Sequence, residues 1–378
     1  MLRQAQHERP VTVKECAMIQ EKKDSLMFSG NIYIFHAFDV GDDIHLDKIA
    51  DLPDITVKKL IPPKYFKNYH VPLSIDLPQP TKDNATFLSC KIYNFGAISL
   101  TYKVPFQGSL VNLRKDFNQL YDQYQEQSLT DVKSILKIIN AYIVKPKLFD
   151  VRSSYIAIQI DPQPTRINVT ELQEQYGGII ASTLRFETET LSEEQKNEIL
   201  ESAIGYFRGD LIIVDTDVAF VYDDEFHEIS DFFEFANIQQ LELRFFDWLL
   251  DTQLNRIYEE GAQKLPIKSY LPFIGTLASD PVGELGKLKA DISVITERLE
   301  TSVKIAAEPY FSELYALLVE KLDLENWQKA IDRKLAVIHD IRVVYQHKID
   351  AIREDMLSVL IIALIFTELI IGILSYLK

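Results

Sequence analysis

The sequence contains little cysteine. Cys16 and Cys90 are the two cysteines among 378 residues, and they lie far apart in the chain. Such a chain offers neither a disulfide framework nor a thiolate metal site, which fits a reducing compartment. The first residues also lack the apolar core of a secretory signal, and Glu8 and Glu15 argue against a mitochondrial presequence.

Positive charge is also scarce. The chain has 40 basic and 56 acidic side chains, which gives a formal net charge of -16. This charge repels phosphate backbones and anionic lipid unless a local basic patch overrides it. The nearest candidate, the lysine-rich stretch 58–67, follows Asp51 and Asp54 and is expected to be a solvated face. We therefore expect no direct binding of nucleic acid.

The common catalytic motifs are missing. Gly177 and Gly178 form a lone glycine pair before an expected strand, and no Lys-Ser/Thr pair follows them, as a phosphate-binding loop would require. We find neither a Gly-x-Ser-x-Gly elbow nor a cysteine–histidine signature. These absences favour a non-enzymatic protein that uses no cofactor.

The strongest enzyme-like signal is the segment "LIIVDTDVAF" at 211–220. Asp215 and Asp217 follow an apolar strand, as in phosphotransferases that form an aspartyl phosphate. Those enzymes need a loop after the second aspartate, so that the carboxylates can bind Mg²⁺. Here residues 218–222 are typical of a second strand, which makes Asp-Thr-Asp a hairpin turn. A metal-dependent phosphotransferase that uses both aspartates remains the alternative hypothesis.

Two acidic clusters, at 39–47 and 223–228, combine carboxylates with a histidine. Neither cluster has the spacing of an EF-hand loop or the paired histidines of zinc enzymes. His339 and His347 lie eight positions apart on one expected helix, too far to share a metal without a partner subunit. We expect both clusters to be solvated turns and expect no bound metal.

Length and pattern predict several regions. A chain of 378 residues exceeds the usual size of one core. Residues 1–28 lack periodicity and are expected to form a flexible arm. Residues 29–228 mix strands and helices without strict alternation, which predicts an α+β domain with a mixed sheet. The expected strands are 31–38, two within 87–104 with a turn at Phe95–Gly96, 154–160, 177–187, and two within 210–226.

Helices of this domain are expected at 44–52, 109–143 and 192–207. The second interval breaks at "SLTD", where Ser128 or Thr130 would cap a second helix. Ser192 and Gln195 form a capping box at the start of the third interval. Five prolines within 60–81 each remove a backbone donor, so that segment must be a loop or a sheet edge.

Beyond residue 229 the chain is expected to be helical. Residues 229–282 form a helical connector whose apolar stripe comprises Leu241, Phe245, Trp248, Leu249 and Leu254. Residues 283–355 carry two stripes at three- and four-residue spacing, joined by a short helix that begins at Pro309. They predict a coiled-coil-like hairpin, folded within one chain or shared between subunits. Its seam comprises Leu285, Leu288, Ile292, Ile295, Leu299, Trp327, Ile331, Ile338, Ile341 and Tyr345.

Residues 356–377, "MLSVLIIALIFTELIIGILSYL", predict one C-terminal transmembrane helix. About 22 residues at 1.5 Å each span roughly 33 Å, which matches a hydrocarbon core of about 30 Å. Lys348 and Arg353 precede the span, and Lys378 follows it. The positive-inside rule therefore places the bulk on the cytoplasmic side of a bacterial inner membrane, or on the matrix side of the mitochondrial inner membrane.

Glu368 lies near the middle of this span, where an ionised carboxylate costs on the order of 3 kcal/mol. Gly372 and Ser375 lie one and two turns further along the same side, and small polar residues are typical of contacts between membrane helices. We expect the helices to associate through Glu368, Gly372 and Ser375. A pore subunit lined by Glu368 is a further alternative, which requires a high-order ring.

Three stretches resemble one family. They are "IYNFGAISL" at 92–100, "DLIIVDTDVAFVYDDEF" at 210–226, and 337–374, where a coiled-coil helix joins a membrane span that bears an acid. These stretches resemble the family of unknown function that contains the "required for meiotic nuclear division" proteins of bacteria, fungi and mitochondria. Glu368 occupies a place where that family commonly has an acid.

The resemblance implies a homo-oligomeric membrane protein without known enzymatic activity, which supports translation of organelle-encoded proteins by tethering ribosomes. With a net charge of -16, a ribosome contact would involve basic proteins rather than RNA. The sequence therefore predicts a membrane-anchored scaffold, whose partners are a second copy of the chain, the lipid bilayer and, by resemblance, the ribosome or other proteins.

Overall fold

A computed structural model gives the structure of the chain, which divides into two compact units. Unit 1 comprises Met1–Glu242 and Leu299–Glu325, and unit 2 comprises Leu243–Arg298 and Asn326–Lys378. The boundaries expected at 28, 228, 282 and 355 remain predictions. The structure describes residues 26–53, 55–58, 66–67, 72–76, 86–162, 167–205, 209–223, 226–261, 286, 289–290, 292, 304–305 and 309–377.

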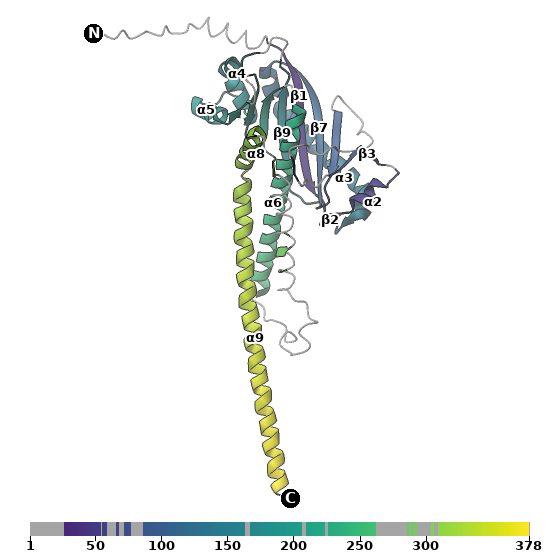
Figure 1. The fold of residues 1–378 in the computed structure, drawn as a ribbon, viewed down its shortest axis with the longest axis vertical. Coiled ribbons are helices and arrows are strands. Elements are labelled where there is room, and N and C mark those ends of the chain that lie inside the picture. Colours follow the sequence, from purple (N-terminus) through teal and green to yellow (C-terminus); the bar gives the residue numbers. More distant parts are fainter. Residues whose placement is uncertain are drawn as a thin grey trace, which may run out of the picture. The chain divides into compact units, whose positions relative to one another are not determined.

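Unit 1 is built around a mixed sheet, whose described strands follow the order β10-β11-β12-β9-β1-β7-β6-β5-β3 (Figure 1). Strand β12 runs parallel to β9, and the other paired neighbours in this described sheet are antiparallel. The expected α+β class with a mixed sheet is thus confirmed. The strands are β1 (Phe28–Asp39), β3 (Thr56–Lys58), β5 (Leu73–Asp76), β6 (Thr86–Ile92), β7 (Ala97–Gly108), β9 (Arg152–Ile160), β10 (Ala203–Ile204), β11 (Leu211–Val214) and β12 (Val218–Tyr222).

The turn between β6 and β7 lies where the sequence predicts it. The backbone N–H of Tyr93 donates to the Ala97 carbonyl across the turn. Gly96 has φ = +104°, a conformation that side chains with a Cβ rarely adopt. A Cβ built on Gly96 would lie 1.8 Å from the carbonyl oxygen of Gly41, so the two loops touch backbone to backbone.

Replacing Gly96 with alanine is expected to lower the free energy of unfolding by at least about 2 kcal/mol, because the methyl group clashes with Gly41 and the positive φ is strained. Gly178→Ala is the matched control. Its Cβ would lie 3.8 Å from Thr190 Cγ2, and a helix favours alanine over glycine by roughly 0.5–1 kcal/mol. Urea denaturation followed by circular dichroism measures both variants. Equal effects of the two substitutions would contradict the prediction.

The expected break at "SLTD" is wrong, because α3 (Leu110–Ile139) is one continuous helix. Ser109 caps its start and accepts a hydrogen bond from the Asn112 N–H. Ser128 is buried inside the helix, and its hydroxyl donates to the Gln125 carbonyl one turn earlier. A serine that bonds back to its own helix does not end it. Ser128 could cap a new helix or lie within a continuous one, and its burial favours the continuous helix.

The expected strand at 177–187 is also wrong. Most of it belongs to α4 (Val169–Leu184), which Asn168 caps by accepting a hydrogen bond from the Thr170 N–H. A Cβ on Gly177 would lie 2.9 Å from Leu200 Cδ1 of α5, so this glycine lets two helices approach closely. A short apolar run does not distinguish a buried helix from a strand. Here burial at four-residue spacing decides for the helix, at Leu172, Tyr176, Ile180 and Leu184.

Other local expectations are mostly confirmed. The short helix near 44–52 is α2 (Leu46–Ala50), and α5 (Glu193–Glu201) begins after Ser192, whose hydroxyl accepts from the Gln195 N–H. The helix ends earlier than expected, because β10 follows directly. Within the proline-rich segment 60–81, β5 pairs with both β3 and β6, so this strand is not at the edge. The smaller described pairs are β2 (Asp43–Ile44) with β8 (Ile143–Val144), and β4 (Phe66–Lys67) with β13 (Lys304–Ile305).

Helices cover both faces of the sheet. On one face α3 and α4 pack over a large apolar core. On the other face lies the start of α6 (Phe226–Gly261), where Phe226 stacks on Tyr33 of β1 with ring centroids 4.3 Å apart. Helix α8 (Pro309–Lys321) begins at the expected proline and contacts α6 through stacking of Phe311 on Phe232.

The apolar stripe expected along α6 is only partly correct. Leu241 is buried, but Trp248 is 40% exposed, and Phe245, Leu249 and Leu254 are half-buried. The most deeply buried apolar residues of α6 in unit 1 are Phe232, Phe233, Ala236, Ile238 and Leu241. The first part of α6 packs on the sheet, so contact with the sheet, and not the helical spacing alone, decides which of its side chains are buried.

Unit 2 contains the long helix α9 (Leu324–Tyr376), which joins the two helices expected at 324–355 and 356–377 into one. Lys334 of α9 makes ion pairs with Asp247 and Asp251 of α6, with Nζ–Oδ1 distances of 2.6 and 2.7 Å. These ion pairs join α9 to α6.

Candidate functional site

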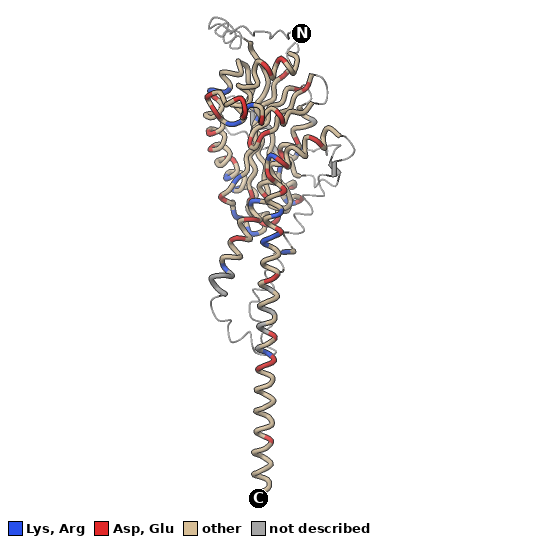
Figure 2. Tube along the Cα trace, turned by 90° about the vertical axis from the view of Figure 1, so that its left-hand side faces the viewer, with Lys and Arg blue, Asp and Glu red and all other residues tan. Residues whose placement is uncertain are grey.

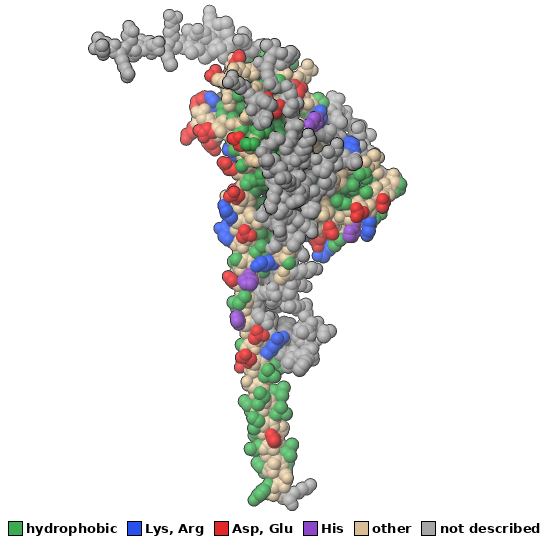
Figure 3. Space-filling view, in the orientation of Figure 1, with side chains coloured by type: hydrophobic (Ala, Val, Ile, Leu, Met, Phe, Trp, Pro, Cys, Tyr) green, Lys and Arg blue, Asp and Glu red, His purple; other side chains and the backbone are tan. Residues whose placement is uncertain are grey.

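The membrane-like part of α9 is the most distinctive surface of the chain. From Arg353 to Tyr376 the helix has 24 residues, and an 18-residue window within it has a mean hydropathy of 2.7 and no buried residue. After Asp355 this stretch contains one charged residue, Glu368, in an otherwise uncharged helix (Figure 2), and apolar side chains cover it (Figure 3). A helix of this length rises about 36 Å. The described chain thus has one helix that is long and apolar enough to cross a membrane, close to the expected 356–377.

The residues expected to associate the membrane helices all lie on this exposed stretch. Glu368 and Ser375 are exposed, and a Cβ on Gly372 would find no atom within 4 Å. Within one chain these side chains therefore contact no other described element. Their role in association remains a prediction that concerns a second molecule.

The expected coiled-coil seam is described only in part. Ile292, Ile331 and Ile338 are buried, and Trp327 and Ile341 are half-buried. Tyr345 belongs to α9, but its side chain lies outside the described residues, as do Leu285, Leu288, Ile295 and Leu299. The hairpin partner of α9 thus remains a prediction, whereas contact with α6 through Lys334 is a feature that the sequence analysis missed. Acids four residues apart at Asp247 and Asp251 were the available signal.

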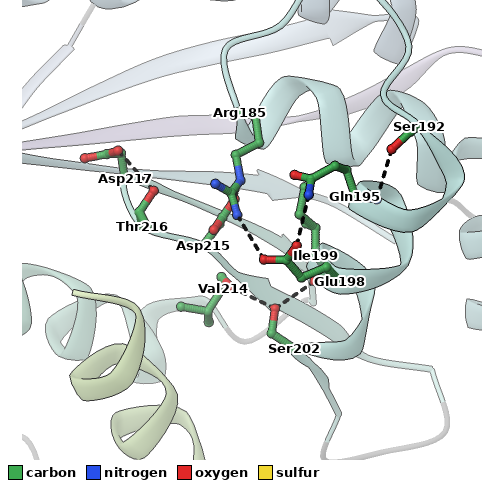
Figure 4. Close-up of polar contacts among 10 residues, drawn as sticks. All are labelled: Arg185, Ser192, Gln195, Glu198, Ile199, Ser202, Val214, Asp215, Thr216 and Asp217. Carbon is green, nitrogen blue, oxygen red and sulfur yellow. Dashed lines mark hydrogen bonds and ion pairs between the residues drawn. The ribbon is translucent and has the colours of Figure 1, made fainter. Parts of the chain in front are cut away.

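The Asp-Thr-Asp segment forms the hairpin turn that the sequence predicts. The N–H of Asp215 donates to the Val218 carbonyl, and β11 and β12 pair on either side of the turn. Asp215 is buried and makes an ion pair with Arg185, with 2.5 Å between Oδ2 and Nε. Asp217 is exposed beside Thr216, whose hydroxyl donates to it. Figure 4 shows Asp215 turned toward Arg185 and Asp217 beside Thr216.

This geometry separates the two aspartates that the phosphotransferase hypothesis needs together. Burial raises the pKa of Asp215, and the guanidinium of Arg185 acts against that rise. An aspartate already paired with an arginine inside the protein is poorly placed to bind Mg²⁺ or attack a phosphate. The described residues also contain no group of three or more His, Cys, Asp or Glu side chains arranged to hold a metal ion.

The first acidic cluster is not simply a solvated turn, as the sequence analysis expected. Asp42 and Asp47 are exposed, and Asp42 pairs with Lys145 at 2.5 Å. Asp39, however, is 3% exposed at the end of β1. In the second cluster His227 is exposed and Asp223 is buried, whereas residues 224–225 lie outside the described residues.

A buried ionic network lies between the sheet and α6, and the sequence analysis missed it. Lys91 of β6 is 8% exposed, and its Nζ lies 2.8 Å from Asp231 Oδ1 and 2.6 Å from Glu234 Oε2. The Thr101 hydroxyl of β7 lies 3.5 Å from the other oxygen of Glu234. Because Asp231 and Glu234 both belong to α6, their ion pairs with Lys91 fix this helix against the sheet. The lone lysine in an apolar strand was the only sequence signal.

A second pair of buried polar groups comprises one carboxyl group of the sheet and one of α6. Asp39 and Glu242 are both buried, and Glu242 Oε1 has no hydrogen-bond partner. Burial and the nearby charge of Asp42 raise the pKa of Asp39 to about 8. Burial and the charge of Asp39 raise the pKa of Glu242 well above its usual value. Near neutral pH Asp39 is therefore mostly protonated, and burial together with the charge of Asp39 disfavours ionisation of Glu242.

Comparison with known proteins places the chain among proteins whose activity is not established. The family described as "Uncharacterized protein MJ0711, N-terminal domain" matches residues 29–228, which is more than half of the chain. The chain belongs to this family. The uncharacterized protein MJ0711 of Methanocaldococcus jannaschii is 26% identical over 280 residues, which cover 66% of this chain and 80% of that protein. No solved structure matches the chain.

The MJ0711 N-terminal domain covers only part of the features described above. It includes Lys91, Asp39 and the turn at Asp215, all of which belong to the sheet. The α6 partners of Lys91 lie beyond residue 228, as does the apolar stretch of α9. The domain match thus ends just after α6 begins at Phe226, before the acids that hold α6 on the sheet.

Proposed function

We propose that the protein is a membrane-anchored, homo-oligomeric scaffold that holds its α+β region at a membrane surface and recruits protein partners without catalysing a reaction. One observation carries the proposal: an unbroken helix leads from the folded region into the stretch Arg353–Tyr376, which is long and apolar enough to cross a membrane. In water so large an exposed apolar surface is unfavourable, and a lipid bilayer removes it. The absence of convergent catalytic groups around Asp215 agrees with a role in binding.

The distribution of charge suggests which side of the membrane holds the bulk of the chain. Lys348 and Arg353 precede the span, and Lys378 follows it. By the positive-inside rule, the bulk faces the cytoplasm, or the matrix of a mitochondrion. Self-association would use the stripe of Glu368, Gly372 and Ser375, because small and polar residues let membrane helices approach and hydrogen-bond.

Partners other than a second copy are proposed from the resemblance to the family of the "required for meiotic nuclear division" proteins. By that resemblance the scaffold would support translation or the biogenesis of membrane proteins, and it would contact the ribosome. The net charge of -16 favours contact with basic proteins over contact with RNA. No cofactor, metal or nucleic acid is part of this proposal.

Removing the apolar stretch is expected to release the protein from membranes. The full-length chain should stay in the membrane pellet after washes with high salt and alkaline carbonate, and it should dissolve only in detergent. A chain that ends at Asp355 should remain in the soluble fraction, with its folding checked by circular dichroism. Sedimentation and immunoblotting measure both.

A full-length control variant tests whether loss of membrane insertion, rather than the shorter chain, releases the protein from the membrane. Changing Ile361 and Ile365 to lysine places two charges within the span, each unfavourable by about 3 kcal/mol at its centre. This variant should behave like the shortened chain. If the chain that ends at Asp355 still resists the carbonate wash, the anchor is not in α9 and the proposal is wrong.

A further inference from the structure

The part of α9 before the membrane-like stretch has two different faces. Ile331, Leu335 and Ile338 are buried within the chain. Val337 and Val344 point elsewhere and are 40% and 66% exposed. An exposed apolar stripe along one helix face marks a contact surface.

The exposed valines belong to a repeat that continues to the end of the helix. Every seventh residue from Val337 is small or β-branched. The positions four residues after members of this series hold Ile341, Ile362 and Leu369, with Lys348 and Asp355 at the two positions between Ile341 and Ile362. The series is Val337, Val344, Ala351, Ser358, Ile365 and Gly372. Spacing of alternately four and three residues is the pattern of a coiled-coil seam. Because the repeat is seven residues rather than 7.2, helices paired along it supercoil left-handedly, by about 20° per heptad.

The repeat limits what kind of partner fits it. The stripe is exposed in both parts of α9. Val337 and Val344 are exposed before the apolar stretch, and Ile365 is 60% exposed within it. A matching partner must therefore be a helix that itself passes from water into lipid at the same level. A second copy of α9 meets this condition, because copies anchored in one membrane cross it in the same orientation and enter the lipid at the same residue.

We propose that two copies of this chain pair through α9 as a parallel, in-register coiled coil that runs from Val337 to Gly372 across the membrane surface. Ser358 and Gly372 let the helices approach closely in the lipid, where packing rather than the hydrophobic effect holds them together. The pairing names the partner and the surface of the proposed scaffold, and it rests on the proposed membrane anchor.

Cysteine cross-linking in native membranes tests this pairing. Cys16 is replaced with serine throughout, and Cys90 is buried, so a single introduced cysteine reports on its own position. Val337→Cys and Val344→Cys lie on the stripe. Ala336→Cys and Val343→Cys are matched controls, each one residue away and also exposed. Val343 and Val337 have the same exposed fraction, 40%.

After mild oxidation, Val337→Cys and Val344→Cys should each give at least tenfold more disulfide-linked dimer than their neighbours on a non-reducing gel. Equal cross-linking at all four positions, dimer at the control positions alone, or no dimer at any position would overturn the pairing. The carbonate wash on the same samples separates the two proposals. Membrane-bound protein without the expected dimers refutes the pairing alone, whereas protein released by the wash refutes the anchor.

Discussion

Replacing Lys91 with methionine is expected to lower the free energy of unfolding by about 3–5 kcal/mol, the usual effect of leaving a buried charge without its partner. The Lys91 ammonium lies 2.6 Å from Glu234 and 2.8 Å from Asp231. Glu234 is 3% exposed, so water cannot replace the lost cation. Urea denaturation of the chain that ends at Asp355, followed by circular dichroism, measures the change.

Two further variants make this result specific to the buried network. Lys103→Met alters a lysine on the adjacent strand, whose ammonium lies 5.6 Å from the ring of Tyr33, and it should cost less than about 1 kcal/mol. Adding Glu234→Leu to Lys91→Met should recover much of the loss, since the uncompensated carboxylate is then gone. If Lys91→Met costs no more than Lys103→Met, the network does not hold α6 on the sheet.

Stability is expected to fall as the pH rises from about 6.5 to 8, because of Asp39 and Glu242. The pKa of Asp39 is about 8 in the folded chain, and its ordinary value is 3.8. Between these values the folded state holds a proton that the unfolded state has lost, so the free energy of unfolding decreases as the pH increases. For one proton the slope approaches about 1.4 kcal/mol per pH unit.

The pH range matters because His36 acts in the opposite direction at lower pH. Burial, together with the charge of Arg152, lowers the pKa of His36 from 6.5 to about 3. Its contribution to stability is present above pH 6.5 and is lost as the pH falls toward 3. Below pH 6.5 the two effects therefore oppose each other. Above it, the carboxyl pair acts without that opposition.

Asp39→Asn should flatten the decline between pH 6.5 and 8, because asparagine fills the same space without gaining a charge. Glu242→Gln should act in the same direction. Asp47→Asn is the control, since Asp47 is exposed in the first turn of α2, and it should leave the slope unchanged. Denaturation curves at four or five pH values measure the slopes. An Asp39→Asn slope identical to that of the unaltered chain would mean that Asp39 ionises normally.

The sequence by itself determined the features that depend on neighbouring residues. The apolar stretch of α9, the turn at Gly96 and the hairpin at Asp215 are all local, since each needs only a run of apolar side chains or a residue suited to a turn. The start of α5 after Ser192 belongs to the same group, because a capping hydroxyl reaches an N–H three residues away. Interactions between residues close in sequence determine these features, and the structure confirms them.

Only the tertiary structure decided the remaining features. Gly177 belongs to a helix because apolar side chains at four-residue spacing are buried there, and Ser128 stays helical because its side chain is enclosed and bonds back to α3. Lys91 meets Glu234 across 143 positions of sequence, a pairing that no local pattern encodes. Burial also shifts the pKa of Asp39, which rises first through desolvation and then through the nearby charge of Asp42. These features depend on contacts between segments far apart in the sequence. Such contacts exist only in the complete fold, so a local sequence pattern could not predict them.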